Sequence, residues 1–415
     1  MILFNIKGGS LLFALSILFF VSILLSLFIS FNLGMNKLHY KYITHEKAIN
    51  LLTESFNLGF HMKSNTYNGQ LLEDNNLTVS IKKKAWGGFT TIVSSVKLDS
   101  TNTLSKTALI GNKLSKDYCL YIKNNNSYLS ITGNTKIKGD CYLPEKGVKL
   151  SYVEGKSYLG KKLIFGKTFQ SKSVLPKINN YFIQENTNKL NGVFNPEDSI
   201  IYTSEIEAQE LSNSFKNKTW ILKSNTPIIL NSSWNVNGNI IIYSNQKITV
   251  KAGVKLNNIV LYSPRISIEE NVKGSFQVVA NKSIYIANNV TLEYPSLVFA
   301  LGDSSVIDIK ENTIIEGGVL SIAKGNFLQK KNKVNLAKNS TIKGLAYCNN
   351  ALELKGNVYG KVICDKLTYR SPSTSYTNQL IDVTIDNSKL PDFFSTTPIL
   401  KPKKTPEVKI IQWLD

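Results

Sequence analysis

The sequence predicts an α+β protein that is anchored in a membrane near its N-terminus and is mainly β-strand in its C-terminal half. Three observations lead to this fold class. Residues 10–33 carry no charged side chain, which is typical of a transmembrane helix. A short apolar phrase recurs between residues 245 and 369, and apolar and polar residues alternate within it. The alternation indicates strands, and the recurrence indicates a single-stranded parallel β-helix.

The repeated phrase consists of two apolar residues one position apart, a short gap with Asn or Gly, and a further apolar residue. Its copies begin at Ile248, Ile266, Ile284, Ile307, Val334 and Leu352. The corner positions that follow are Gly253, Asn271, Asn289, Asn312, Asn339 and Asn357, at steps of 18, 18, 23, 27 and 18 residues. Gly and Asn suit such corners because they tolerate the left-handed backbone conformation.

A strand-like unit of this length cannot bury its apolar face alone, whereas stacked copies can. We therefore expect about six coils, with Ile266 and Ile268 on the inner face and Ser267 on the outer face. A plain antiparallel sheet with similar turn spacing is the alternative. The recurrence of the corner residue at a matching place favours the β-helix.

The uncharged run Ser10–Leu33 has 24 residues, and a helix of that length spans about 36 Å, enough to cross a bilayer core of about 30 Å. A cleaved secretory signal is the alternative. The run is longer than a usual signal core and no small-x-small cleavage site follows it, so the prediction is a single-pass helix after a short cytoplasmic N-terminus at residues 1–9.

The remaining boundaries follow from composition and pattern. After the membrane helix, residues 34–113 are expected to form a helix and antiparallel strands, the strands near residues 77–82, 89–98 and 104–111. The later regions are an early coil at 114–143, an insertion at 144–219 with a short helix introduced by Ser204 and Glu207, the β-helix at 220–369, and a C-terminal strand and exposed tail at 370–415.

The four cysteines form two pairs, each separated by about one coil: Cys119 with Cys141, and Cys348 with Cys364. Residues one coil apart stack at about 4.8 Å, a separation that a disulfide accepts. The pairs therefore predict coil-to-coil disulfides and an oxidising compartment, with buried free thiols as the alternative. Neither pair has the spacing of a zinc or redox site.

The predicted orientation of the chain in the membrane follows from the two cysteine pairs. Lys7 precedes the apolar run, while Lys37, Lys41 and Lys47 follow it, so the positive-inside rule taken alone would place the C-terminal side in the cytoplasm. Long domains translocate largely regardless of such charges. We therefore expect a bacterial cell membrane protein whose C-terminal domain is periplasmic or otherwise extracytoplasmic.

The chain is strongly basic, with 49 Lys and Arg against 29 Asp and Glu and a net charge of +20. Arg occurs only at Arg265 and Arg370, so the charge is nearly all lysine. Solvated lysines on a β-structure are one interpretation, and attraction to an anionic envelope polymer is the other. No pattern of arginines and aromatic residues indicates a specific nucleic-acid site.

The N-terminal segment, with Lys7, Gly8 and Gly9 before the apolar run, resembles the start of type IV minor pilins and type II secretion minor pseudopilins. The resemblance implies processing after Gly8 or Gly9, a pilin-like α/β stalk, and partners in a secretion or pilus-like assembly. The chain departs from the family at Ala14, where most pilins carry Glu.

The repeated phrase resembles the coil of bactofilins, which polymerise through a β-helix core. The same phrase occurs early, as Leu129-Ser130-Ile131 followed by Asn134, Ile137 and Gly139. The resemblance implies a bactofilin-like parallel β-helix and, as one variant of the structural hypothesis, filaments formed by residues 220–369.

Candidate catalytic groups are few, and we predict no catalytic, cofactor or metal site. The three histidines, His39, His45 and His61, all lie beside the membrane run. Carboxylates in the repeat region do not recur at one coil position, which indicates solvated side chains rather than a polysaccharide-cleaving groove. These carboxylates are Glu269, Glu270, Glu293, Asp303, Asp308, Glu311 and Glu316.

Two functional hypotheses follow. The first is a non-enzymatic envelope protein, a structural, adhesion or secretion-filament component that uses the β-helix as a contact surface. The second is a membrane-anchored β-helix protein that acts on or binds polysaccharide. Acidic residues converging in one groove would favour an enzyme, whereas uniform Lys, Asn and Ser faces would favour the structural protein.

Overall fold

The computed structural model describes residues 9–62, 64–69, 77–99, 102–202, 210–325, 330–401 and 407–414. It divides into two compact units. The first comprises Met1–Lys82 and Ser94–Ser105, and the second comprises Lys83–Val93 and Lys106–Asp415. The second unit contains nearly all of the strands.

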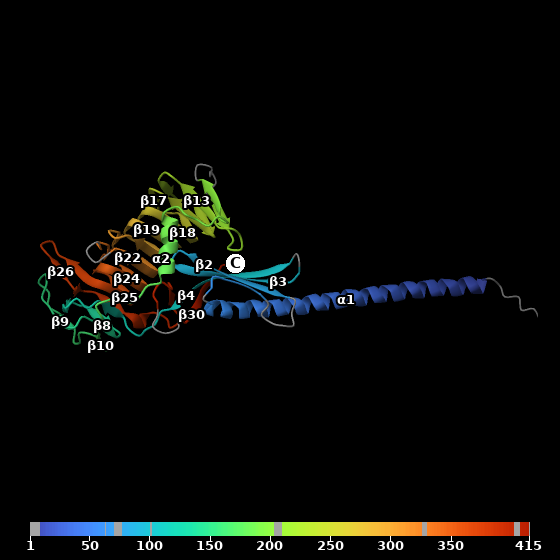
Figure 1. Cartoon of the computed structure of the whole chain (residues 1–415), viewed down its shortest axis with the longest axis horizontal. Coiled ribbons are helices and arrows are strands. Elements are labelled where there is room, and N and C mark those ends of the chain that lie inside the picture. The colour runs from blue at the N-terminus through green and yellow to red at the C-terminus, as the bar shows by residue number, and fades with distance from the viewer. Residues whose placement is uncertain are drawn as a thin grey trace, which may run out of the picture. The chain divides into compact units, whose positions relative to one another are not determined.

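The first unit contains helix α1 (Gly9–His61), an unbroken helix of 53 residues (Figure 1). All of its residues from 9 to 43 are exposed, whereas Ala48, Leu51, Leu52 and Phe56 are buried. Among the described residues it is the one helix long and apolar enough to cross a membrane. The helix predicted after the apolar run is present as the second part of α1, and membrane crossing itself stays a prediction.

The antiparallel strands expected after the helix are present. The strands of this sheet are β1 (Thr66–Gly69), β2 (Thr78–Trp86), β3 (Phe89–Lys97), β4 (Thr103–Lys113), β29 (Ser395–Thr396) and β30 (Val408–Trp413). Strand β1 pairs antiparallel with β2, and in the second unit β29 and β30 both pair antiparallel with β4. Within the first unit the buried Ser55 hydroxyl bonds to that of Ser94.

The prediction of an exposed C-terminal tail is wrong for the described residues. Strand β30 returns to the sheet beside β4, and Ile399 and Leu414 are buried. A mostly apolar run such as Val408 to Leu414 can complete a sheet edge, which residue pattern alone does not reveal. Residues 402–406 of the predicted tail lie outside the described residues.

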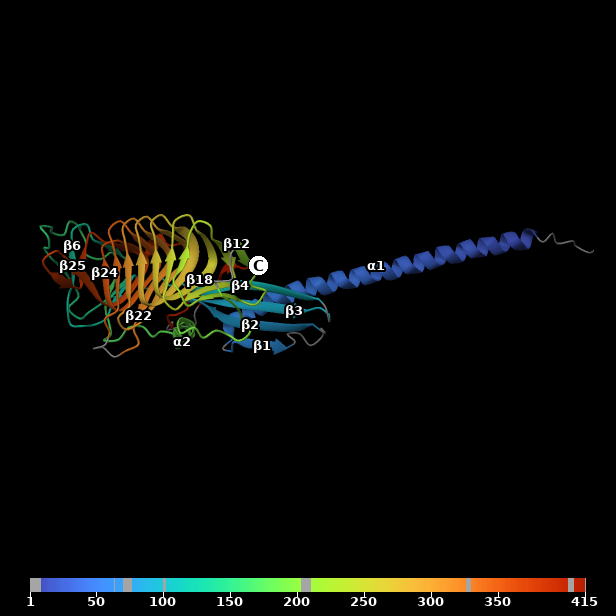
Figure 2. The same cartoon turned by 90° about the horizontal axis from the view of Figure 1, so that it is seen from above.

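The second unit is dominated by a closed sheet of mostly parallel strands, here called the coil stack (Figure 2). Its first strands are β11 (Ser199–Tyr202), β12 (Glu210–Asn213), β13 (Trp220–Ser224), β14 (Ile228–Leu230), β15 (Asn235–Gly238), β16 (Ile240–Ser244) and β17 (Lys247–Val250). The next are β18 (Lys255–Ile268), β19 (Lys273–Ile286), β20 (Thr291–Leu301), β21 (Val306–Ile309), β22 (Ile314–Ile322), β23 (Lys333–Leu336), β24 (Thr341–Leu354) and β25 (Asn357–Arg370).

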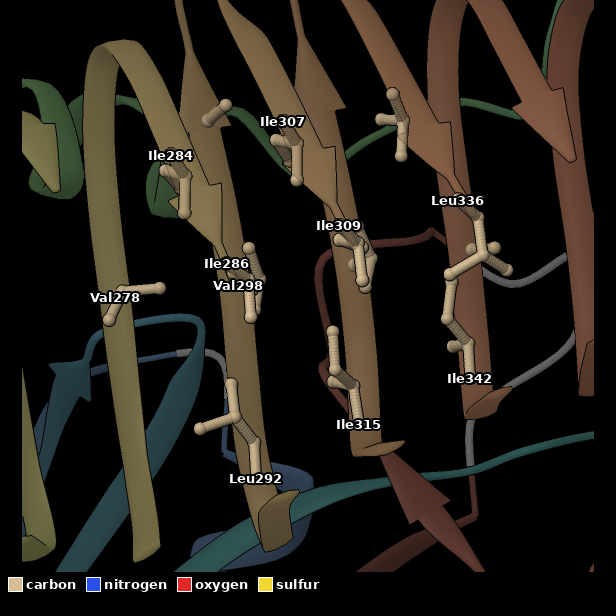
Figure 3. Close-up of a cluster of buried hydrophobic side chains, with 14 of the residues drawn as sticks. Val278, Ile284, Ile286, Leu292, Val298, Ile307, Ile309, Ile315, Leu336 and Ile342 are labelled. Atoms are coloured by element: carbon tan, nitrogen blue, oxygen red, sulfur yellow. The ribbon is translucent and has the colours of Figure 1, made fainter. Parts of the chain in front are cut away.

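The repeated phrase sets the register of these coils. Parallel pairing joins the first apolar position of each phrase to that of the next coil, in the order Ile248, Ile266, Ile284, Ile307, Val334 and Leu352. Each of these side chains is at most 1% exposed, and Figure 3 shows part of this inner column. The predicted parallel stacking is confirmed, and the antiparallel alternative is wrong.

The corner residues behave as the sequence predicts, with one exception. Gly253 and the asparagines at 271, 289, 312 and 339 all have a positive φ, between 57° and 82°. The chain turns there in the left-handed region that Gly and Asn tolerate. Asn357 instead begins strand β25, and its side-chain oxygen accepts a hydrogen bond from the Thr384 N–H at 3.0 Å.

One outer face of the coil stack is also buried, which the alternating phrase did not predict. A second column runs through Tyr262, Val279, Phe299, Leu320 and Tyr347, all at most 3% exposed. Helix α2 (Asn180–Leu190) and the tip of the β2–β3 hairpin, from the same unit, pack against it. Strands buried on both faces read as continuous apolar runs, such as residues 240–243 and 297–301.

The early coil stacks at the far end of the coil stack, after β25 (Figure 1). Strand β5 pairs in parallel with β25, and β6 and β7 pair with β27 and β28. The end strands are β5 (Leu120–Ile122), β6 (Leu129–Thr132), β7 (Lys136–Lys138), β8 (Cys141–Leu143), β9 (Val148–Leu150), β10 (Thr168–Gln170), β26 (Ser375–Thr377), β27 (Gln379–Ile381) and β28 (Thr384–Asp386). The 3-10 helix η2 (Asn387–Lys389) follows β28.

The region predicted as an insertion also contributes coils. Strands β9 and β10 continue the parallel ladder at one end, and β11 and β12 begin it at the other. Ser204 and Glu207 lie outside the described residues, and Glu210–Asn213 form strand β12 rather than continuing a helix. Among the described residues of this region, the helix is α2, which begins after Asn179, whose side chain accepts the Tyr181 N–H.

A buried polar cluster holds the hairpin tip to the coil stack. The Gln277 side chain donates to the Trp86 carbonyl at 3.0 Å and accepts the Gly88 N–H at 2.9 Å. Lys189 of α2 donates to the Ala85 carbonyl at 3.0 Å. Because each backbone group at the tip would otherwise be buried without a partner, these side chains stabilise the docked hairpin.

Lys189 makes the stability of this cluster depend on pH. Burial is the main cause that lowers the pKa of Lys189 to about 8, and the nearby Lys84 ammonium lowers it further. The carboxylates of Glu185 and Asp198 oppose this and raise the pKa. In the unfolded chain the pKa returns to about 10.4. Between these values the unfolded state binds more protons than the folded state, so stability rises with pH.

We therefore expect the free energy of unfolding of the wild type to rise relative to that of Lys189→Met by about 2 kcal/mol between about pH 7.5 and pH 9.5. Urea unfolding of both proteins in the same detergent, followed by circular dichroism, measures this difference. Stability curves that stay parallel over this range would contradict the assignment.

Candidate functional site

The residues predicted for N-terminal processing are only partly described. Gly8 lies outside the described residues, and Gly9 is the exposed first residue of α1. The three histidines all lie on α1 with exposed side chains. They do not belong to the coil stack, so any site on the stack must be built from other residues.

The four cysteines are buried in the interior of the coil stack. Cys348 and Cys364 are paired in register on β24 and β25, and the sulfur atoms of Cys119 and Cys141 are 3.7 Å apart. The one-coil separation inferred from the spacing therefore holds for both pairs. Whether the pairs are oxidised stays a prediction.

The carboxylates of the repeat region are dispersed and mostly engaged locally. Glu293 pairs with Lys273 at 3.0 Å, Asp308 with Lys310 at 3.0 Å, and Glu316 with Lys343 at 2.7 Å. The side chains of Glu270 and Asp303 accept hydrogen bonds from Asn288 and from the Lys324 and Gly325 N–H groups, and Glu269 and Glu311 are exposed. Among the described residues no three His, Cys, Asp or Glu side chains gather as a metal site would require.

The coil stack carries a lysine-lined hollow of about 510 Å³. Its floor is formed by Tyr347 and Asn349 of β24 and by Asp365 of β25. Its walls carry the side chains of four lysines, Lys123, Lys177, Lys330 and Lys401. These lysines come from segments that are far apart in the chain, and the fold brings them around one opening.

The walls of this hollow are held by backbone and side-chain hydrogen bonds. The Lys401 N–H donates to the Lys177 carbonyl at 2.8 Å, and the Asn179 N–H donates to the Ile399 carbonyl at 2.7 Å. On the floor, the Asn349 side chain both donates to and accepts from the Ala323 backbone at 2.8 Å. The lysine side chains therefore extend from a fixed frame.

The hollow carries a net positive charge. Its one carboxylate, Asp365, pairs with Lys123 at 2.8 Å, and both side chains are largely buried. The ammonium groups of Lys177, Lys330 and Lys401 form no ion pair with any residue that the structure describes. Burial, with Asp365 nearby, raises the pKa of the Tyr347 hydroxyl, so this phenol remains neutral at neutral pH.

This arrangement can bind an anion but offers little for acid–base chemistry. Lysine ammonium groups are mobile point charges that donate to phosphate, sulfate or carboxylate oxygens. Asp365 would be the general base of the hollow, yet it already accepts a charged hydrogen bond from Lys123. The sequence indicated an anionic ligand only through the overall positive charge of the chain. The four lysines do not recur at a regular spacing, so no local pattern predicted that they lie together.

The chain matches no protein-family model, no curated protein and no solved structure. The resemblances to minor pilins and to bactofilins therefore remain predictions from short stretches of sequence.

The disulfide prediction has a direct test in native extracts. Burial raises the pKa of Cys348 to about 12 and that of Cys364 well above its ordinary value, so these cysteines would react slowly in the folded protein even if they were reduced. The protein must therefore be unfolded without reductant in the presence of iodoacetamide, so that every free thiol can react. Mass spectrometry then counts the labelled cysteines. We expect no labelled cysteine, and four labelled cysteines would remove the argument for an oxidising compartment.

Proposed function

We propose that this chain is a non-enzymatic, single-pass bacterial envelope protein whose coil stack contacts an anionic envelope polymer. The observation that carries the proposal is the lysine-lined hollow, with three ammonium groups unpaired among the described residues. An extended polymer suits the site because the remaining positive charge of the chain, +20 in all, adds a long-range attraction.

The role of α1 as an anchor is supported by its continuity. The exposed apolar run, residues 10–33, continues without interruption into a helical segment whose Leu51, Ser55 and Phe56 are buried in the fold. A secretory signal ends at its cleavage site, so it is not expected to continue as one helix into residues packed in the fold. The apolar run leaves a large hydrophobic surface exposed, and a bilayer would cover it.

The pilin-like part of the proposal concerns processing at the start of α1. Cleavage after Gly8 or Gly9 would leave the helix as the mature N-terminus, as in the minor pilins and pseudopilins that this segment resembles. The coil stack would then lie outside the cytoplasm, in the periplasm or beyond it, as a contact surface of a secretion or filament assembly.

The mass of the N-terminal peptide from native membranes tests this part. We expect a mature chain that begins at Gly9 or Ser10. An intact Met1 would show that no prepilin-type processing takes place, and would leave an ordinary membrane anchor. A chain beginning beyond Leu33 would show that the apolar run is a cleaved signal.

The contact with an anionic polymer is tested by removing charge from the hollow. The double variant Lys177→Gln, Lys330→Gln removes two of its ammonium groups. We expect binding to polygalacturonate or polyphosphate to weaken by about 5- to 30-fold, since each contact is worth about 0.5–1 kcal/mol. Binding of the wild type should also weaken as salt is raised.

The matched control removes the same charge elsewhere on the coil stack. Lys251 and Lys282 are exposed and lie outside the hollow, so Lys251→Gln, Lys282→Gln should bind nearly as the wild type does. Equal losses in the two double variants would show that overall charge, rather than the hollow, attracts the polymer. Breakdown of polygalacturonate by the wild type would favour the enzyme hypothesis instead.

A further inference from the structure

A second hollow of about 480 Å³ lies on the coil stack, and its lining is uncharged. The polar side chains around it belong to Asn237, Asn257, Asn258, Ser275 and Gln412. Tyr294, Pro295 and Ile411 complete the lining. In a chain with 78 charged residues among 415, a hollow without a charged side chain selects against ionic ligands.

The amide groups of this hollow are available for a ligand. The side chains of Asn237, Asn257, Asn258 and Gln412 make no hydrogen bond to any residue that the structure describes. Other asparagines of the stack do use their side chains, as Asn235 does with Glu210 and Asn288 with Glu270. A carboxamide both donates and accepts, which matches the hydroxyl groups of a neutral sugar.

Successive coils place these groups in a row. Asn237 of β15 pairs in register with Asn257 of β18, which pairs with Ser275 of β19. Coils lie about 4.8 Å apart, so the row presents polar groups at a regular interval along the stack. Such a row fits an extended chain of repeating units better than a single compact molecule.

The remaining walls are held rigidly. Asn258 has a φ of 58°, and its carbonyl accepts the Trp86 indole N–H at 3.2 Å. The Tyr294 hydroxyl donates to the Ser395 carbonyl at 2.9 Å, and its ring packs against Phe394 with centroids 5.1 Å apart. The Tyr294 ring can therefore serve as a fixed apolar wall for the C–H face of a sugar ring.

Two irregularities of strand pairing meet at this hollow. The register between β18 and β19 shifts after Asn257, and that between β30 and β4 shifts between Ile410 and Gln412. Such shifts re-aim side chains and are common beside functional sites. Here they lie next to Asn258, Ile411 and Gln412, all of which line the hollow.

From these observations we propose that the hollow is a binding site for a neutral glycan chain. The row of free amides donates to and accepts from sugar hydroxyls on adjacent units, and Tyr294 supports one ring. The site is separate from the lysine-lined hollow and shares no lining residue with it. The proposed glycan site does not depend on whether the lysine-lined hollow binds an anionic polymer.

The test is calorimetric titration of the full-length chain in detergent with cellohexaose, maltohexaose and chitohexaose. We expect at least one of them to bind the wild type, and Asn257→Ala with Gln412→Ala to weaken that binding by about tenfold or more. Tyr294→Phe keeps the ring and should bind nearly normally, whereas Tyr294→Ala should lose most of the binding.

Asn335→Ala is the matched control, because Asn335 points outward on β23 and lies outside the hollow. Circular dichroism confirms that each variant is folded. The proposal is overturned if none of the three hexasaccharides binds at about 10 mM, or if the double variant Asn257→Ala, Gln412→Ala binds as tightly as Asn335→Ala does. The Lys177→Gln, Lys330→Gln variant should bind the sugar normally, which separates this site from the lysine-lined hollow.

Discussion

The structure depends on the burial of apolar side chains between successive coils. Each coil contributes one aliphatic residue to the inner column from Ile248 to Leu352, and every member is almost fully buried. A single coil could not bury its own apolar face, so coils are stable only in a stack. Parallel pairing in register follows because a shift by one residue would turn the inner column outward.

The stack in turn needs a cover over its second apolar column. Tyr262, Phe299 and Leu320 face outward from the coils, and the hairpin tip and α2 bury them. The hairpin brings backbone groups into this apolar layer, and the side chains of Gln277 and Lys189 supply their partners. These polar contacts explain why a glutamine and a lysine are buried among apolar residues.

The two hollows arise from the same architecture by different routes. In the uncharged hollow, coil register alone places Asn237, Asn257 and Ser275 in a row, and β30 adds Gln412. In the lysine-lined hollow, the floor comes from β24 and β25, while the lysines lie in segments between strands. A stack of this kind therefore offers repeating polar rows together with charges that loops supply.

The sequence by itself determined the long helix, the parallel coils, their register and most of their corners, because each leaves a local mark. An apolar run, an alternating phrase and a recurring Asn or Gly are visible without knowledge of distant contacts. Only the tertiary structure decided that residues 119–143 stack beyond β25, that β30 returns to β4, and that four distant lysines line one hollow. Such contacts join segments hundreds of residues apart, and neither strand pattern nor residue spacing specifies which edges meet.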